Sequence, residues 1–223
     1  MIADRWSQEN MTNTVHSVQE AAPVAVFALD VLKLFIGAFL GATCAFWFER
    51  WKKQKEEKER RINSCRAAQF ALTSRINTLM NVVAQQLEPH RNNPNRWAEL
   101  PPILVSPQHP ELPVNDLCFL LDNLDPNLVG ELHVCNTKFD TCLQTIQLRN
   151  SLHEEFQKEF EKDQVGPRLQ VCLHKLTDDL YDIVFSAETY LREKHAALGA
   201  CMKKHFPGCT VLQFENRNAD SNK

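Results

Sequence analysis

Cys201, His205 and Cys209 follow one another at intervals of four residues near the C-terminus. Residues four apart share a helical face, and a turn at Pro207 could return Cys209 to the first two. Thiolate and imidazole are ligands that zinc prefers, but a structural zinc site needs four, and the spacing identifies no fourth. We therefore expect no metal and no cofactor. We interpret the cysteines as small core residues and the histidine as a surface residue near a helix C-terminus, with a zinc site as the alternative.

Arg168 and His174 form a second pair whose residue types could do chemistry. An arginine can orient a phosphate, and a histidine can act as a general acid or base. The pair resembles the loose arginine–histidine motif of the helical HEPN ribonucleases, although the resemblance covers only these two residues. Leu169 stands where that family has a polar residue. The resemblance implies, as an alternative function, a ribonuclease in which Arg168 orients phosphate and His174 transfers protons.

Three acidic residues, Asp178, Asp179 and Asp182, lie on the same predicted helix and lack a matching acidic cluster, so we interpret them as a solvated surface. The chain has six glycines and none of the glycine-rich loops that cradle phosphates. Its net charge is −3, so we expect no nucleic-acid partner. The composition therefore favours a binding or structural role, and an enzymatic one stays uncertain.

Residues 24–48 form an apolar segment that carries only two charges, Asp30 and Lys33. A helix needs roughly 20 residues to cross the hydrocarbon core, so this segment is long enough to span a membrane. The two charges lie near its outer end, three residues apart, where they can pair and Lys33 can reach the interface. We therefore predict one transmembrane helix, with the membrane as a partner.

The residues around the end of this segment predict its orientation. Trp47 and Trp51 are typical of the aromatic belt at a membrane interface. Arg50, Lys52 and Lys53 begin a basic run that the preceding residues lack. The positive-inside rule places this side in the cytoplasm and residues 1–23 outside as a short tail. We expect a single-pass protein of a bacterial inner membrane.

Gly37, Gly41 and Ala45 are spaced as small residues on one stripe of the apolar helix. Asp30 and Lys33 lie on or beside the same stripe. Small residues let two membrane helices approach closely, so the stripe predicts packing in a homo-oligomer or against a membrane protein partner. Two alternatives stay open. In one, the stripe has no packing role, because glycine and alanine are common in membrane helices. In the other, oligomerised anchors that carry the two charges form a pore.

The rest of the chain predicts helices. Residues 49–61 are almost wholly charged and continue the anchor as a helical stalk. Apolar residues then recur at intervals of three or four in three long stretches, beginning at residues 62, 126 and 167. Pro89 ends the first stretch, Asp125 caps the second, and Gly166-Pro167 separates the last two. Residues 62–215 thus form one cytoplasmic domain, and residues 216–223 are expected to fray.

The fold class that we predict is all-α: a transmembrane helix that continues as a charged stalk into a three- to four-helix bundle. Seven of the eleven prolines lie in residues 89–115, so this loop is expected to contain no α-helix and is either a partner-binding segment or a crossover. A short helix over 117–121 follows, with Asn115 or Asp116 as its cap.

The buried faces of the last two long helices are expected to include Phe160 and Cys172. The predicted function is assembly of proteins at the cytoplasmic membrane face, as a scaffold, sensor or accessory subunit.

Overall fold

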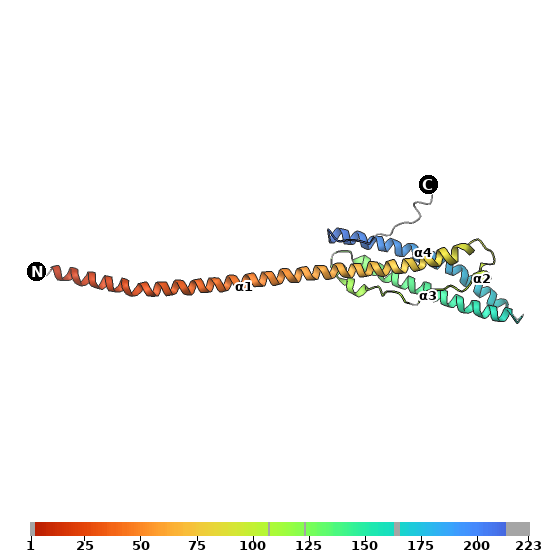
Figure 1. The fold of residues 1–223 in the computed structure, drawn as a ribbon, viewed down its shortest axis with the longest axis horizontal. Helices are drawn as coiled ribbons and strands as arrows, with labels where there is room; N and C mark the ends of the chain where they lie inside the picture. The colour runs from red at the N-terminus through yellow and green to blue at the C-terminus, as the bar shows by residue number, and fades with distance from the viewer. Residues whose placement is uncertain (1–2, 107, 123, 163–165, 213–223) are drawn as a thin grey trace, which may run out of the picture. The chain divides into compact units, whose positions relative to one another are not determined.

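The computed structural model describes residues 3–106, 108–122, 124–162 and 166–212, with side chains at residue 27 and from residue 29 onward. Within these residues the chain is mostly helical and contains no strand, which confirms the all-α prediction (Figure 1). The chain divides into two units, Met1–Glu57 and Lys58–Lys223. The predicted frayed tail, 216–223, lies outside the described residues.

Helix α1 (Ala3–Val82) begins earlier than the predicted anchor and includes most of the segment that we expected to be a short tail. Its backbone passes at Val83 into a π-helical turn, η1 (Val83–Leu87), and then into a 3-10 turn, η2 (Glu88–His90). Pro89 lies in the first positions of η2, where its missing N–H costs no hydrogen bond. The long helix therefore ends close to the proline, as the sequence predicts, but through two irregular turns.

In the second unit, α3 (Pro126–Phe160) and α4 (Pro167–His205) pack along each other, and η3 (Val114–Leu121) packs on α3. The Asp125 carboxylate accepts a hydrogen bond from the Leu128 N–H at 3.4 Å, so it caps α3 as predicted. Residues from the C-terminal part of α1 join the same buried core. They recur at helical spacing and include Cys65, Ala68, Leu72, Ile76, Leu79 and Val82.

The proline-rich region departs from the prediction in two places. A four-residue α-helix, α2 (Arg96–Glu99), forms between Pro94 and Pro101, where we expected no α-helix. A single helical turn can form here because none of its backbone hydrogen bonds requires an N–H from a proline. The predicted short helix is instead the 3-10 helix η3, which starts at Val114 without a side-chain cap, so neither Asn115 nor Asp116 caps it.

Two side chains that we expected in the core are exposed. Phe160 is 65% exposed because it is the last residue of α3, where the tilted Phe156 ring is its neighbour at 5.9 Å between ring centroids. Cys172 is exposed because its neighbour Leu173, which is fully buried, occupies the core position of that turn. The prediction of both side chains as buried is therefore wrong.

Candidate functional sites: an exposed apolar helix and a pocket at Trp97 and His174

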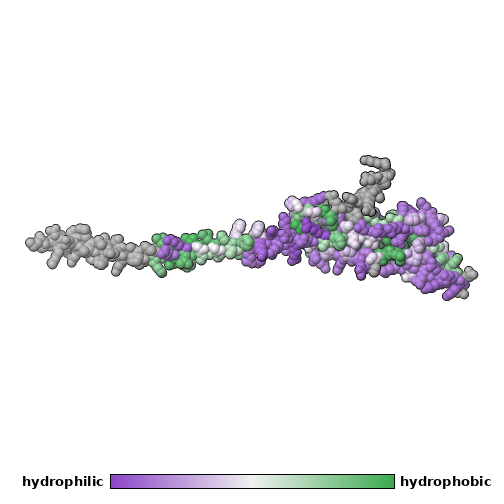
Figure 2. Space-filling view, in the orientation of Figure 1, coloured by the Kyte–Doolittle hydropathy of each residue, from purple (hydrophilic) through white to green (hydrophobic). Residues whose placement is uncertain are grey.

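The apolar part of α1 leaves its side chains exposed. All described side chains from residue 27 to residue 56 are exposed. An 18-residue window in this part of the helix has a mean hydropathy of 1.8, and none of it is buried within the chain (Figure 2). By length and composition, it is the one helix in the described part of the chain that can cross a membrane.

Asp30 and Lys33 contact each other on this exposed surface. The Lys33 ammonium lies 3.2 Å from an Asp30 carboxylate oxygen, at the i, i+3 separation that one helical face allows. Pairing partly offsets the cost of taking either charge out of water. The helix therefore presents a compensated pair in its otherwise apolar segment.

Gly37 and Gly41 lie in open space. A Cβ atom added to either glycine would meet no atom within 4 Å in the described structure. Ala45 is exposed in the same way. This stripe of small residues therefore leaves room for the backbone of another helix to approach closely.

The basic run that follows is solvent-exposed and partly paired along the helix. Lys53 contacts Glu49 at 2.7 Å, and Lys52 contacts Glu56 at 3.8 Å. Trp47, Arg50 and Trp51 are also exposed, and the Lys55 ammonium lies 5.8 Å from the Trp51 ring centroid. An indole next to basic side chains suits the polar boundary of a membrane.

The three residues of the zinc alternative have different surroundings. Cys201 is buried, which raises the pKa of its thiol and disfavours the thiolate that zinc requires. The Cys209 thiol donates to the Met202 carbonyl at 3.6 Å, and the His205 ring is half-buried. No group of three or more histidine, cysteine or acidic side chains among the described residues is arranged to hold a metal ion, so the zinc alternative gains no support.

His174 has contacts other than those that the ribonuclease alternative would need. Its Nδ1 atom lies 3.2 Å from an Asp178 carboxylate oxygen, and the other Asp178 oxygen accepts two hydrogen bonds from Arg96, at 2.7 and 3.1 Å. Arg168 is exposed, and no described contact joins it to His174. Asp178 thus links a histidine of α4 to an arginine of α2, and it is not merely a solvated acid as we expected.

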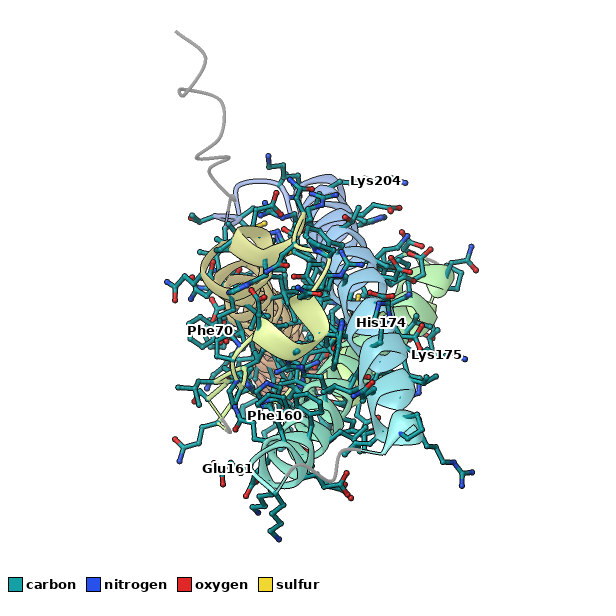
Figure 3. All side chains as sticks on the ribbon, turned by 90° about the vertical axis from the view of Figure 1, so that its right-hand side faces the viewer. Phe70, Phe160, Glu161, His174, Lys175 and Lys204 are labelled. Carbon is teal, nitrogen blue, oxygen red and sulfur yellow. The ribbon has the colours of Figure 1, made fainter. Side chains whose placement is uncertain are left out.

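A cavity of about 380 Å³ lies beside this network. Its lining comes from Trp97 of α2 and from Gln170, Val171, His174 and Lys175 of α4. The Trp97 indole lies 6.3 Å from the His174 ring and meets Phe156 edge-on at 5.3 Å. Figure 3 shows His174 and Lys175 on α4, with Lys175 extending into solvent.

Sequence reasoning missed Arg149 and the contacts that hold the proline-rich segment in place. Arg149 is fully buried in α3 and donates to the carbonyls of Trp97, at 3.3 Å, of Pro101, at 3.0 Å, and of Leu100. Burial lowers the pKa of its guanidinium to about 10, so it stays charged at neutral pH. No carboxylate among the described residues contacts it, so carbonyl dipoles take the place of a counter-ion.

The neighbouring turns of α3 and η1 continue this clamp. His153 lies one turn after Arg149, and its Nε2 atom lies 3.0 Å from the Ala98 carbonyl. Asn150 pairs with Ile103 and Gln86 pairs with Leu104, each through the backbone N–H and C=O. The signal in the sequence was the spacing: Arg149 and His153 continue the buried stripe of Ile146 at steps of three and four, where a polar residue predicts a buried partner.

The chain matches no protein-family model, no curated protein and no solved structure at the level that indicates common descent.

Proposed function

We propose that the protein is a single-pass membrane protein that assembles with a second copy, or with another membrane protein, at the cytoplasmic face. The observation that supports this is the apolar segment of α1, which buries none of its side chains within the chain. Apolar side chains exposed over such a length are stable in lipid or against another protein. The charged stalk over 49–61 would then connect the anchor to a cytoplasmic helical bundle.

The flanking charges support the orientation that we propose. Arg50, Lys52 and Lys53 follow the apolar segment, whereas residues 1–23 contain one basic residue. Basic residues are retained on the cytoplasmic side, so the second unit would lie in the cytoplasm. In a bacterium this membrane would be the inner one.

The open stripe at Gly37 and Gly41 is the contact surface that we propose within the membrane. Both glycines leave room for a close approach, and Asp30 and Lys33 lie on or beside the same stripe, where a neighbouring helix would shield them from lipid. This arrangement favours a homo-oligomer or a membrane protein partner. A pore through oligomerised anchors is a second use of the same stripe.

Membrane insertion is tested first, and self-association is tested second. The full-length chain should stay with vesicles after alkaline carbonate washing, and its release into the aqueous fraction would refute the anchor. Replacing Gly37 and Gly41 together with leucine should then abolish cross-linking between copies in membranes. Thr43→Leu is the matched control, because residue 43 faces the opposite side of the helix. Unchanged cross-linking in the glycine variant would refute the homo-oligomer and leave a heteromeric partner.

The exposed thiols of the second unit test the orientation. Cys118 and Cys172 are exposed, whereas burial raises the pKa of the Cys65, Cys135 and Cys142 thiols to about 12, which makes them unreactive. A membrane-impermeant maleimide should label Cys118 and Cys172 only after the cells are opened. Labelling of intact cells would show that the second unit lies outside.

A further inference from the structure

The cavity between α2 and α4 has a fixed aromatic wall. The Arg149 guanidinium holds the Trp97 carbonyl at 3.3 Å, and His153 holds the carbonyl of the next residue, Ala98, at 3.0 Å. Phe156 packs edge-on against the indole. These contacts fix both the backbone and the ring of Trp97, so its half-exposed indole is already placed for a ligand and loses little freedom on binding.

His174 presents one nitrogen in a fixed orientation. Its Nδ1 atom is engaged by Asp178, whose charge is compensated by Arg96. The outer nitrogen, Nε2, has no hydrogen-bond partner among the described residues. The ring can therefore donate from Nε2 when it carries two protons, as a cation held in place by a carboxylate.

Two further polar groups lie at the same cavity. Lys175 is exposed, makes no ion pair with any described residue, and extends from the outer rim (Figure 3). Gln170 contributes an amide one turn before His174. The lining thus combines a flat aromatic surface with an uncompensated cation and two hydrogen-bonding groups, and its acidic neighbour Asp178 is already paired.

We propose that this cavity binds a small aromatic anion: a flat ring stacked on Trp97 and joined to a phosphate or carboxylate that meets His174 and Lys175. The ring gains from stacking on the indole, and the anionic group gains charge-assisted hydrogen bonds. A volume of about 380 Å³ suits a ligand of one or two rings. The site is independent of the apolar segment and of its role in a membrane.

Isothermal titration of the full-length protein in a non-ionic detergent tests this assignment. Adenosine 5′-monophosphate and benzoate serve as the aromatic phosphate and the aromatic carboxylate, with adenosine and inorganic phosphate as half-ligands. At least one of the two aromatic anions should bind saturably, and both half-ligands should bind at least about tenfold more weakly. Equal binding by phosphate or adenosine alone, or no binding by either aromatic anion, overturns the proposal.

Variants assign the binding to this cavity. Trp97→Leu, His174→Ala and Lys175→Ala should each weaken binding by about tenfold, because each removes one of the proposed contacts. Trp97→Phe keeps a ring against Phe156 and should retain most of the affinity, so a folding defect in the leucine variant does not decide the outcome. His133→Ala and Lys203→Ala are the matched controls on exposed positions elsewhere. Binding that survives all three cavity variants would place the ligand elsewhere and overturn the assignment.

Discussion

Asn150 pairs with Ile103 through two hydrogen bonds: its side-chain oxygen accepts from the Ile103 N–H at 2.9 Å, and its amide donates to the Ile103 carbonyl at 2.8 Å. Gln86 repeats this arrangement with Leu104 from the other side, at 3.2 and 3.4 Å. Each amide therefore makes the same pair of hydrogen bonds to the loop backbone that a residue of a neighbouring β-strand would make. A loop that contains many prolines and little regular structure is held in one conformation by side chains of its neighbours.

Replacing Asn150 with alanine should release this segment. The variant leaves the Ile103 N–H and C=O without partners, at a cost of about 1–3 kcal/mol, while the rest of α3 stays intact. Leu104 is 84% exposed, so we expect faster cleavage next to it by thermolysin. Asn127→Ala, at an exposed position near the start of α3, is the control. Equal cleavage rates for the two variants would contradict the clamp.

Replacing Arg149 with methionine should destabilise the second unit more strongly. Methionine can fill much of the space, but the carbonyls of Trp97, Leu100 and Pro101 lose their donor. We expect a loss of about 3 kcal/mol in the free energy of unfolding, or a fall of about 6–12 °C in Tm. Thermal unfolding followed by circular dichroism measures the change. A Tm within about 2 °C of the wild type would show that the buried charge is dispensable.

Acidification should destabilise the fold through His153. Burial is the main cause that lowers its pKa below the ordinary value, and the neighbouring Arg149 charge lowers it further. The unfolded chain therefore binds a proton more readily than the folded chain, and stability falls as the pH drops below about 6.5. Buried His195, whose pKa burial also lowers, adds to the same trend.

Thermal unfolding between about pH 7.5 and pH 5 tests this contribution. His153→Gln can still donate to the Ala98 carbonyl but does not titrate, so its Tm should fall less on acidification than that of the wild type. His133→Gln, at an exposed position, should behave as the wild type does. If the Tm of the His153→Gln variant fell with pH as steeply as that of the wild type, this histidine would not be the cause of the acid sensitivity.

The sequence predicts the long helices well because each carries its own signals. The spacing of Leu128, Leu132 and Phe139 identifies a buried face, and Asp125 followed by proline identifies its start. The apolar segment is equally clear, because 25 residues with only two charges are long enough to cross a bilayer and too apolar for an ordinary surface helix. These features are local, and periodicity and caps are enough to predict them.

The pocket could not be predicted in the same way. The sequence pairs His174 with Arg168 by their spacing, yet its partners are Asp178 and, through it, Arg96, which lies 82 positions from Asp178 in the chain. That contact depends on where α2 lies, and α2 is placed by Arg149 and His153 of a third helix. Phe160 shows a different limit of the sequence prediction. It continues the apolar pattern of α3, but it lies beyond the part of α3 that other elements cover.

The double pairing of Ile103 and Leu104 also bears on how the protein avoids aggregation. Ile103, Leu104 and Val105 are consecutive apolar residues outside regular secondary structure, and free main-chain groups in such a segment can pair with a strand of another chain. Here the main-chain groups of the first two are already occupied on both sides, so an incoming strand finds neither donors nor acceptors there. Two amide side chains thereby close the main chain at buried Ile103 and exposed Leu104 to pairing with another chain.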